Sequence, residues 1–330
     1  PGLNAVIRAV VRRAERGFGD QVVGFLDGWR GVVEDDTVAL DVDACRGLLP
    51  RGGTVLRTSR LQPFGMQDGV ERARGTIERH DLDGLVVVGG EGTLSCARGL
   101  HELGFPVVGV PKTIDNDINA TEMTFGFETA VEIATEAIDR LHTTAESHDR
   151  VMVVEVMGRH VGHIAAWAGM AGGATVTLVP EEPFDVAEVC EVVRRRHERG
   201  RFASVLVVAE GARPIEGTMD MPEEEVDVFG HVRLGGIAHL VAAEIGRRTS
   251  FDTRVTILGH VQRGGTPTAF DRVLASRFGV AAVDAIHEGG LGMMTSLTAG
   301  EIVLVPLADA VAEVKKLDSG LWETAKVFFA

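Results

Sequence analysis

Short apolar runs, rich in Val and Leu, recur along the whole chain and are separated by stretches of helical length. Runs that are apolar at nearly every position are typical of strands buried on both faces, as in a parallel sheet that helices cover. Chains that alternate such strands with helices belong to the α/β class. We therefore predict an α/β fold with strands at residues 21–25, 85–88, 107–110, 151–156, 175–179, 205–209 and 255–258. Helices are predicted at residues 68–80, 127–145, 186–200 and 237–248.

The length of the chain predicts two similar lobes rather than one. It has 330 residues, whereas a single hydrophobic core usually stops growing at about 250–300 residues. One boundary is expected near Gly126 and Phe127, where a motif-bearing loop gives way to a long helix, and a second within residues 259–265. Each lobe is expected to be a mostly parallel sheet covered by helices on both faces.

Composition argues against several classes of protein. The formal net charge of -15 disfavours a nucleic-acid binder, because such proteins need a basic face that neutralises phosphates. No stretch approaches the roughly 20 apolar residues that a membrane-spanning helix needs. Cys45, Cys96 and Cys190 are far apart and form no CxxC pair, so neither a disulfide framework nor a zinc site is predicted. The expected location is the reducing cytoplasm.

A glycine-rich loop, GGEGT at residues 89–93, follows the predicted strand at 85–88. Its glycines would let backbone N–H groups approach an anion, and the helix that follows would add a positive dipole end. It is neither a Walker A loop nor a complete dinucleotide fingerprint, because Ser95 stands at the third glycine position. Taken alone, such a loop is more often a tight turn. Glu91 would repel a polyphosphate unless a cation lay between them, which predicts Mg²⁺ nearby.

The segment PKTIDND at residues 111–117 follows the next predicted strand and carries an ammonium, a hydroxyl and two carboxylates. Phosphoryl transfer uses this combination, because one carboxylate can accept the proton of an attacking alcohol while another holds Mg²⁺. Lysine and a hydroxyl can offset charge on the transferred phosphate. The alternative is an Asx-type turn that Asn116 stabilises. The nearby GGEGT loop favours a kinase site.

Three further polar loops follow predicted strands, at residues 155–160, 210–211 and 258–265. In open α/β sheets, ligands bind outside the carboxyl ends of the strands. Guanidinium groups match phosphate oxygens, so a phosphate clamp is predicted from Arg150, Arg159, Arg254 and Arg263. Each of these arginines alone would more often be a surface ion pair, and His260 alone would more often be structural.

In these motifs the chain resembles the 6-phosphofructokinases of bacterial type, the glycolytic enzymes that transfer a phosphoryl group to O1 of fructose 6-phosphate. The resemblance rests on PGLNAVIR, GGEGT, PKTIDND, EVMGRH, AEGA and LGHVQRGGTPTAFDR, in the family's order. It implies a donor lobe of residues 1–126 plus about 262–312, and a sugar-phosphate lobe of residues 127–261 plus about 313–330. The family's first strand and its GGGD-like loop are expected to precede Pro1.

The resemblance also implies a role for individual residues. Asp115 matches the catalytic base, Thr113 the hydroxyl that contacts the transferred phosphate, and Arg60 an arginine that approaches the phosphates. Mg²⁺ would be held by Glu91 and Asp117, directly or through water, although the family usually has the shorter aspartate at position 91. The sugar phosphate would be held by Thr113, Asp115, Met157, Gly158, Arg159, Glu210, His260 and Arg263. Arg150 and Arg254 would reach the site of a neighbouring subunit, which implies a homodimer or homotetramer.

The phosphoryl donor is the point on which the family members differ. Gly90, Glu91, Gly92 and Thr93 would line the donor site. Gly92 resembles the ATP-dependent enzymes, because aspartate at this position would exclude the α-phosphate, whereas Lys112 resembles the pyrophosphate-dependent ones. Trp29 matches an aromatic residue that packs against adenine, the alternative being a core or surface aromatic. We weigh Gly92 more heavily and expect ATP, with a pyrophosphate-dependent enzyme as the alternative.

Two other functions are less consistent with these residues. An NAD-binding dehydrogenase is a more distant alternative, and the incomplete fingerprint and Glu91 count against it. A non-catalytic sugar-phosphate sensor would not need Thr113, Asp115 and Asp117 together. Arg8, Arg12, Arg199 and Arg201 match basic residues of the family's effector pocket, but Val42, His142 and Thr175 replace two arginines and a metal-binding glutamate. Regulation by ADP or phosphoenolpyruvate is therefore expected to be weak or absent.

Overall fold

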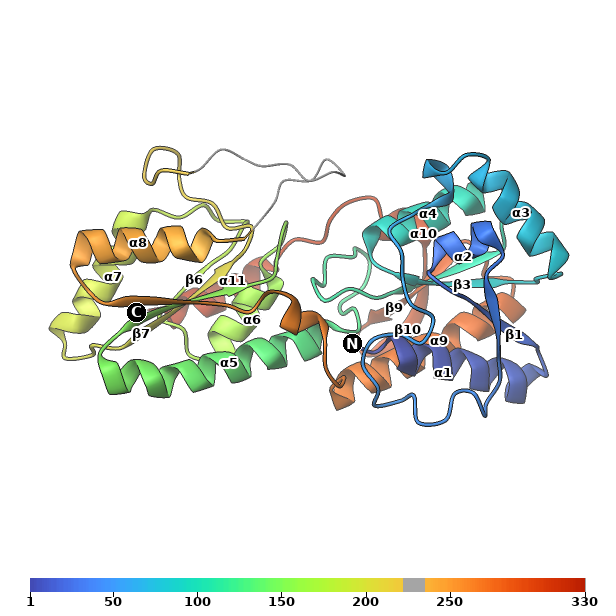
Figure 1. The fold of residues 1–330 in the computed structure, drawn as a ribbon, viewed down its shortest axis with the longest axis horizontal. Helices are drawn as coiled ribbons and strands as arrows, with labels where there is room; N and C mark the ends of the chain where they lie inside the picture. The colour runs from blue at the N-terminus through green and yellow to red at the C-terminus, as the bar shows by residue number, and fades with distance from the viewer. Residues whose placement is uncertain (222–234, 330) are drawn as a thin grey trace. The chain divides into compact units, whose positions relative to one another are not determined.

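The computed structural model describes residues 1–221 and 235–329. The chain divides into two compact units, each of which contains its own sheet (Figure 1). Unit 1 comprises Pro1–Thr129 and Arg263–Lys315, and unit 2 comprises Ala130–Gln262 and Lys316–Ala330. The chain is an α/β protein, as its apolar runs predict.

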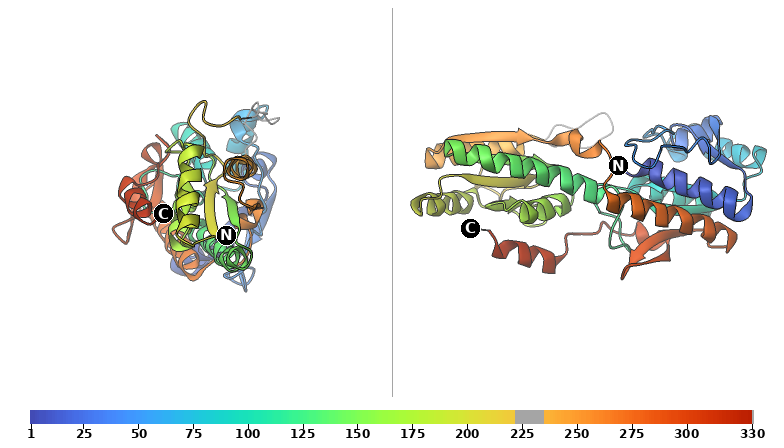
Figure 2. Two further views of the ribbon diagram at one scale, coloured as in Figure 1. Left: turned by 90° about the vertical axis from the view of Figure 1, so that its left-hand side faces the viewer. Right: turned by 90° about the horizontal axis from the view of Figure 1, so that it is seen from below.

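The main sheet of unit 1 has four strands in the order β10-β9-β4-β3. β3 (Leu85–Gly89), β4 (Val107–Pro111) and β9 (Met293–Thr298) are parallel, and β10 (Glu301–Pro306) is antiparallel to β9. One face of the sheet is covered by α1 (Leu3–Arg13) and α9 (Ala269–His287), which lie side by side in Figure 2. The other face is covered by α4 (Glu91–Glu102) and the short α10 (Leu307–Ala310), with α2 (Trp29–Glu34) and α3 (Gly69–Arg79) beyond them.

A separate two-stranded sheet in unit 1 corrects one prediction. β1 (Val22–Phe25) pairs antiparallel with β2 (Thr37–Leu40) and does not join the parallel sheet. Only the last two residues of β1 are buried, since its first two valines are half-buried. The apolar run at 21–25 was therefore wrongly interpreted as a strand buried on both faces. Short single turns complete the unit at η1 (Ala14–Phe18) and η2 (Pro63–Gly65).

The sheet of unit 2 is entirely parallel, with strands in the order β6-β7-β5-β8. Its two central strands, β5 (Val151–Val156) and β7 (Ser204–Ala209), are buried at every residue, which explains why each is apolar at all but one position, Glu155 in β5 and Ser204 in β7. The outer strands are β6 (Val176–Leu178) and β8 (Thr253–Ile257). The 3-10 turn η3 (Gly259–Arg263) follows β8 and ends at the unit boundary.

Helices cover both faces of this second sheet (Figure 1). α7 (Val186–Glu198) and α8 (Ile237–Thr249) pack on one face, where they share a core with Val153 and Leu206. α5 (Phe127–His148) and α6 (His163–Ala171) lie on the opposite side, and α11 (Ser319–Val327) packs against α6.

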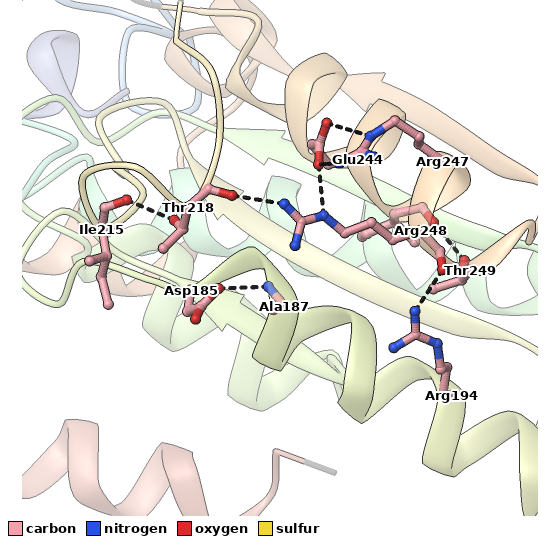
Figure 3. Close-up of polar contacts among 10 residues, drawn as sticks. Asp185, Ala187, Arg194, Ile215, Thr218, Glu244, Arg247, Arg248 and Thr249 are labelled. Atoms are coloured by element: carbon pink, nitrogen blue, oxygen red, sulfur yellow. Dashed lines mark hydrogen bonds and ion pairs between the residues drawn. The ribbon is translucent and has the colours of Figure 1, made fainter.

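Arginine side chains tie α7 and α8 together at the surface of unit 2 (Figure 3). Arg194 of α7 donates to the backbone oxygen of Arg248 at 2.6 Å, and Arg248 donates to the oxygen of Thr218 at 2.8 Å. Hydrogen bonds from Arg247 and Arg248 lower the pKa of Glu244 to about 2. The loop that carries Thr218 is thus fixed to α8 by a guanidinium group.

Candidate active site

The GGEGT loop lies where β3 ends and α4 begins, at the carboxyl edge of the unit 1 sheet. The backbone N–H groups of Thr93 and Leu94 donate to the oxygen of Gly90, which starts the first turn of the helix. The Glu91 carboxylate is exposed and accepts a hydrogen bond from the Ser95 hydroxyl at 2.8 Å. A Cβ atom at Gly92 would meet only the Gln62 amide nitrogen, at 3.5 Å. The loop therefore leaves open space beside Gly92.

The PKTIDND segment lies directly beside this loop, because β4 pairs with β3 and the Lys112 N–H donates to the oxygen of Gly89 at 2.8 Å. Its side chains alternate in burial. Ile114, Asn116 and Ile118 are buried, whereas Thr113, Asp115 and Asp117 are half-buried. The hydroxyl and both carboxylates therefore lie on the more accessible side of the loop, as the sequence predicts for a site.

Asp117 has the environment of a cation ligand. Burial raises the pKa of its carboxyl group, and the negative charges of Asp115 and Glu91 raise it further, while a hydrogen bond from Thr113 opposes them. Among the described residues, its Oδ1 atom is buried and accepts no hydrogen bond. A buried carboxylate oxygen without a partner is costly unless a cation contacts it.

No ready-made metal cage exists in the described part of the chain. Within residues 1–221 and 235–329, no group of three or more His, Cys, Asp or Glu side chains is arranged to hold a metal ion. Mg²⁺ usually binds through one or two carboxylates together with substrate phosphates and water. Glu91 and Asp117 fit that pattern better than a site made of protein ligands alone.

Lys112 is a half-buried cation near the Asp115 carboxylate. Burial lowers the pKa of its ammonium group to about 8, and the positive charge of Arg263 lowers it further, whereas Asp115 and Asp271 raise it. Asp271 itself is fully buried and accepts hydrogen bonds from the backbone N–H groups of Gly126 and Thr129, both at 2.8 Å. Asp271 thus links the start of α5 to the surroundings of Lys112.

Of the two other residues predicted to contact the donor, Arg60 is exposed and Trp29 is buried. Arg60 is exposed, in the segment that leads to Gln62, whose amide donates to the oxygen of Gly92 at 3.0 Å. Trp29 is only 6% exposed and packs in the core beneath α4. This burial favours the alternative in which Trp29 is a core residue, and its contact with adenine stays a prediction.

In unit 2, the loops after β5, β7 and β8 meet at the carboxyl edge of the sheet. The Glu210 N–H donates to the oxygen of Val156, and the Gly211 N–H donates to that of Gly158. A Cβ atom at Gly211 would lie 2.0 Å from the oxygen of Arg159, so only glycine allows these loops to approach so closely. Met157 and Gly158 are buried, whereas Arg159 and Glu210 are half-buried and His260 is exposed.

In unit 2, two arginines of the predicted clamp, Arg150 and Arg254, lie away from a third, Arg159. Arg159 follows the carboxyl end of β5, but Arg150 precedes its amino end, and a strand of six residues is about 20 Å long. Arg254 lies beside Arg150, and both guanidinium groups pair with Asp252. Arg263 belongs to unit 1. Within one chain, Arg150 and Arg254 therefore lie away from the phosphate that Arg159 would bind, and their action at a neighbouring subunit's site stays a prediction.

Several residues that support these loops were not predicted from the sequence. Gln262 is fully buried, accepts a hydrogen bond from the Met157 N–H and donates to the oxygen of Gly259. Glu181 accepts two hydrogen bonds from the Gly162 N–H, where α6 begins. Lys315 donates to the loop that carries Asp115 and Asp117. In the sequence, single polar residues in loops resemble ordinary surface side chains.

In residues 1–221 and 235–329, every helix is too short or too polar to cross a bilayer.

The chain is similar to phosphofructokinases and related phosphotransferases. Residues 1–286 match the family model described as Phosphofructokinase. A pyrophosphate-fructose 6-phosphate 1-phosphotransferase of Streptomyces coelicolor is 56% identical, over 100% of this chain and 96% of its own. ATP-dependent 6-phosphofructokinase 3 of the same organism is 55% identical over 99% and 96%, and the ATP-dependent 6-phosphofructokinase of Corynebacterium efficiens is 54% identical over 100% and 95%. These names differ in the phosphoryl donor.

Solved structures with the same fold carry related names. Phosphofructokinase of Pichia pastoris in the T-state superposes with a TM-score of 0.83 at 32% identity, over 99% of this chain and 35% of that chain. A pyrophosphate-dependent phosphofructokinase of Marinobacter aquaeolei has a TM-score of 0.83 at 22% identity, over 100% of this chain and 88% of that chain. The second likeness concerns the fold alone.

Proposed function

The chain belongs to the phosphofructokinase family, and we propose that it transfers the γ-phosphoryl group of Mg-ATP to O1 of fructose 6-phosphate. The products are fructose 1,6-bisphosphate and ADP. The observation that carries the proposal is the alternating burial of residues 113–118, which leaves Thr113, Asp115 and Asp117 together beside the GGEGT loop. Family membership leaves no support for the dehydrogenase alternative.

In the proposed mechanism, Asp115 acts as the general base. It accepts the proton of the sugar 1-hydroxyl while that oxygen forms a bond to the γ-phosphorus, and the bond from phosphorus to the bridging oxygen of ADP breaks. The Asp115 N–H donates to the Thr113 hydroxyl oxygen at 3.1 Å, which orients the Thr113 side chain and fixes the backbone of Asp115. Lys112 and Thr113 offset negative charge on the transferred group.

Glu91 and Asp117 would hold Mg²⁺, which when bound supplies positive charge between the donor phosphates and these carboxylates. The unpartnered Oδ1 of Asp117 supports this assignment. We assign the donor to unit 1 and the sugar phosphate to Met157, Gly158, Arg159, Glu210 and His260 of unit 2, with Arg263 of unit 1 contributing to phosphate binding.

Product identification tests the reaction. The protein is incubated with fructose 6-phosphate, ATP and Mg²⁺, and the products are identified by ³¹P NMR, with EDTA as the control. We expect fructose 1,6-bisphosphate and ADP, and neither when EDTA is present. Release of inorganic phosphate alone, or phosphorylation at another sugar oxygen, would contradict the proposal.

ATP is the proposed donor because the space beside Gly92 is open, with only the Gln62 amide near a Cβ atom at that position. Two observations favour the pyrophosphate-dependent alternative: the 56% identity to a relative of that name, and the half-buried ammonium of Lys112, which could neutralise a small, highly charged donor. An extra cation assists either donor, whereas an obstructing carboxylate would exclude ATP. We therefore rank the ATP-dependent reaction first.

The lowered pKa of Lys112 predicts an alkaline limit to activity. Because the pKa is lowered to about 8, the ammonium is charged below that pH and neutral above it, so kcat/KM for the donor should fall as the pH rises through about 8. Lys112→Arg should keep its charge, so the fall in kcat/KM should move to higher pH. Replacement of the exposed Lys316 by methionine should leave the pH of this fall unchanged. If kcat/KM for the donor falls at the same pH in Lys112→Arg as in the wild type, the titrating group is not Lys112.

We also propose a homo-oligomer, dimer or tetramer, in which Arg150 and Arg254 act at a neighbouring subunit's site. Their separation from Arg159 along β5 supports this, because within one chain they pair with Asp252 instead. Sedimentation velocity at assay concentrations is expected to give the mass of a dimer or tetramer. An active monomer would remove these two arginines from the site.

A further inference from the structure

The ammonium group of Lys315 donates hydrogen bonds to a loop of unit 1. Lys315 lies after α10, far along the chain from the PKTIDND segment. Its Nζ atom donates to three oxygens at 2.9 Å each, those of the Asn116 side chain and of the Thr121 and Glu122 backbones. All three acceptors belong to the loop that carries Asp115 and Asp117.

Asn116 is the centre of this contact. It is 4% exposed and has a positive φ of 55°, the left-handed conformation that turns the chain between the two aspartates. Its side-chain oxygen also accepts a hydrogen bond from the Thr124 N–H at 3.0 Å. Lys315 and Thr124 therefore hold the same oxygen from two sides and fix the turn.

The main chain of Lys315 adds a second constraint. Its backbone N–H donates to the oxygen of Asp117 at 2.9 Å, and the preceding residue, Val314, forms an antiparallel bridge with Ile118. The segment therefore pairs with the loop like a short strand. The backbone of Asp117 and the turn before it are held by the same lysine.

Partial burial of the Lys315 ammonium group costs free energy, because the charge is removed from water. An apolar side chain could fill the same space without the cost of removing a charge from water. Neutral oxygens and the nearby charges of Asp117 and Glu122 offset that cost. An ammonium nevertheless provides what an apolar side chain cannot, three directed hydrogen bonds that converge on one turn.

We propose that Lys315 is a positioning residue for phosphoryl transfer, because its ammonium fixes the Asn116 turn and thereby the spacing of Asp115 and Asp117. The proposal rests on the proposed function of this loop. Groups that orient catalytic or metal-binding side chains typically change activity or metal affinity by about 10- to 100-fold when they are removed. Lys315 touches neither reacting atom.

The test compares Lys315→Met, which keeps the length of the side chain but removes the donors, with Lys315→Arg, which keeps a cation. Lys316→Met is the matched control, since its side chain is exposed and adjacent in sequence. For each variant we measure kcat, KM for fructose 6-phosphate, the melting temperature, and the Kd for Mn²⁺ by water-proton relaxation in the absence of substrates.

We expect Lys315→Met to lower kcat by about 10- to 100-fold and to weaken Mn²⁺ binding by about tenfold. KM for fructose 6-phosphate should stay within about twofold, because the proposed sugar-phosphate residues of unit 2 are untouched. Lys315→Arg should recover most of kcat, and Lys316→Met should equal the wild type. If Lys315→Met does not fold, Lys315→Gln, which keeps one donor group, is measured in the same way.

Two results separate this inference from the proposed function. A lower melting temperature with unchanged kcat and unchanged Mn²⁺ binding would make Lys315 a purely structural brace and overturn the inference. If the wild type does not phosphorylate fructose 6-phosphate but Lys315→Met still weakens Mn²⁺ binding, the positioning role stands and the proposed reaction falls.

Discussion

Replacing Asp115 by asparagine is expected to lower kcat by about 10³- to 10⁴-fold, the upper range for the loss of a general base. Asparagine has the same shape as aspartate but cannot accept the proton of the sugar 1-hydroxyl. Because Asp115 lies on the accessible side of its loop and its N–H is held by Thr113, the backbone should keep its conformation. The Kd values for ATP and fructose 6-phosphate, measured by calorimetry, should change by less than about fivefold.

Asp83→Asn is the matched control for this experiment, because Asp83 is an exposed aspartate of the same unit that precedes β3. It should retain the kcat of the wild type. If Asp115→Asn turned over at a comparable rate, Asp115 would not be the base, and the mechanism proposed for the loop would fail.

Replacing Gly92 by aspartate is expected to lower kcat/KM for ATP by about 10³-fold. Two like charges about 4 Å apart repel by about 4 kcal/mol at an effective dielectric constant near 20, which corresponds to that factor. The backbone itself should tolerate the change, because a Cβ atom at Gly92 meets only the end of the flexible Gln62 side chain, at 3.5 Å. The loss should therefore come from the carboxylate in the donor site.

Gly92→Asn separates charge from size, since its side chain has nearly the same volume and no charge. It should lose less ATP activity than Gly92→Asp if repulsion dominates, and as much if steric exclusion dominates. Rates with pyrophosphate, measured in parallel, should fall by less than about tenfold in Gly92→Asp. Retention of ATP activity within tenfold would show that Gly92 does not decide the donor.

The strands that could be predicted are those whose surroundings are apolar on both faces. β5 and β7 are buried at every residue, and their composition alone identifies them. β9 was missed because Thr295 and Ser296 interrupt its apolar pattern, although both are fully buried and the Ser296 hydroxyl donates to the oxygen of Ala120. β10 was missed as well, since it alternates in burial at the edge of the sheet.

The candidate site was predictable where chemistry is concentrated in a short segment. The GGEGT and PKTIDND loops each place several functional groups within a few residues, and the pairing of β3 with β4 brings the two loops together. Lys315 and Gln62 were not predictable, because each acts on a loop that is distant in sequence. The burial of Trp29 was also not predictable, since an aromatic residue after a glycine suits either a ligand contact or a core.

The most direct test of the account compares the two donors on the full-length wild-type protein. Initial rates of fructose 1,6-bisphosphate formation are measured with fructose 6-phosphate and Mg²⁺, with ATP and pyrophosphate supplied in separate reactions. We predict turnover with ATP and a kcat/KM for pyrophosphate that is lower by at least about 10²-fold. Turnover with pyrophosphate alone would contradict the account and make Lys112, rather than Gly92, the residue that decides the donor.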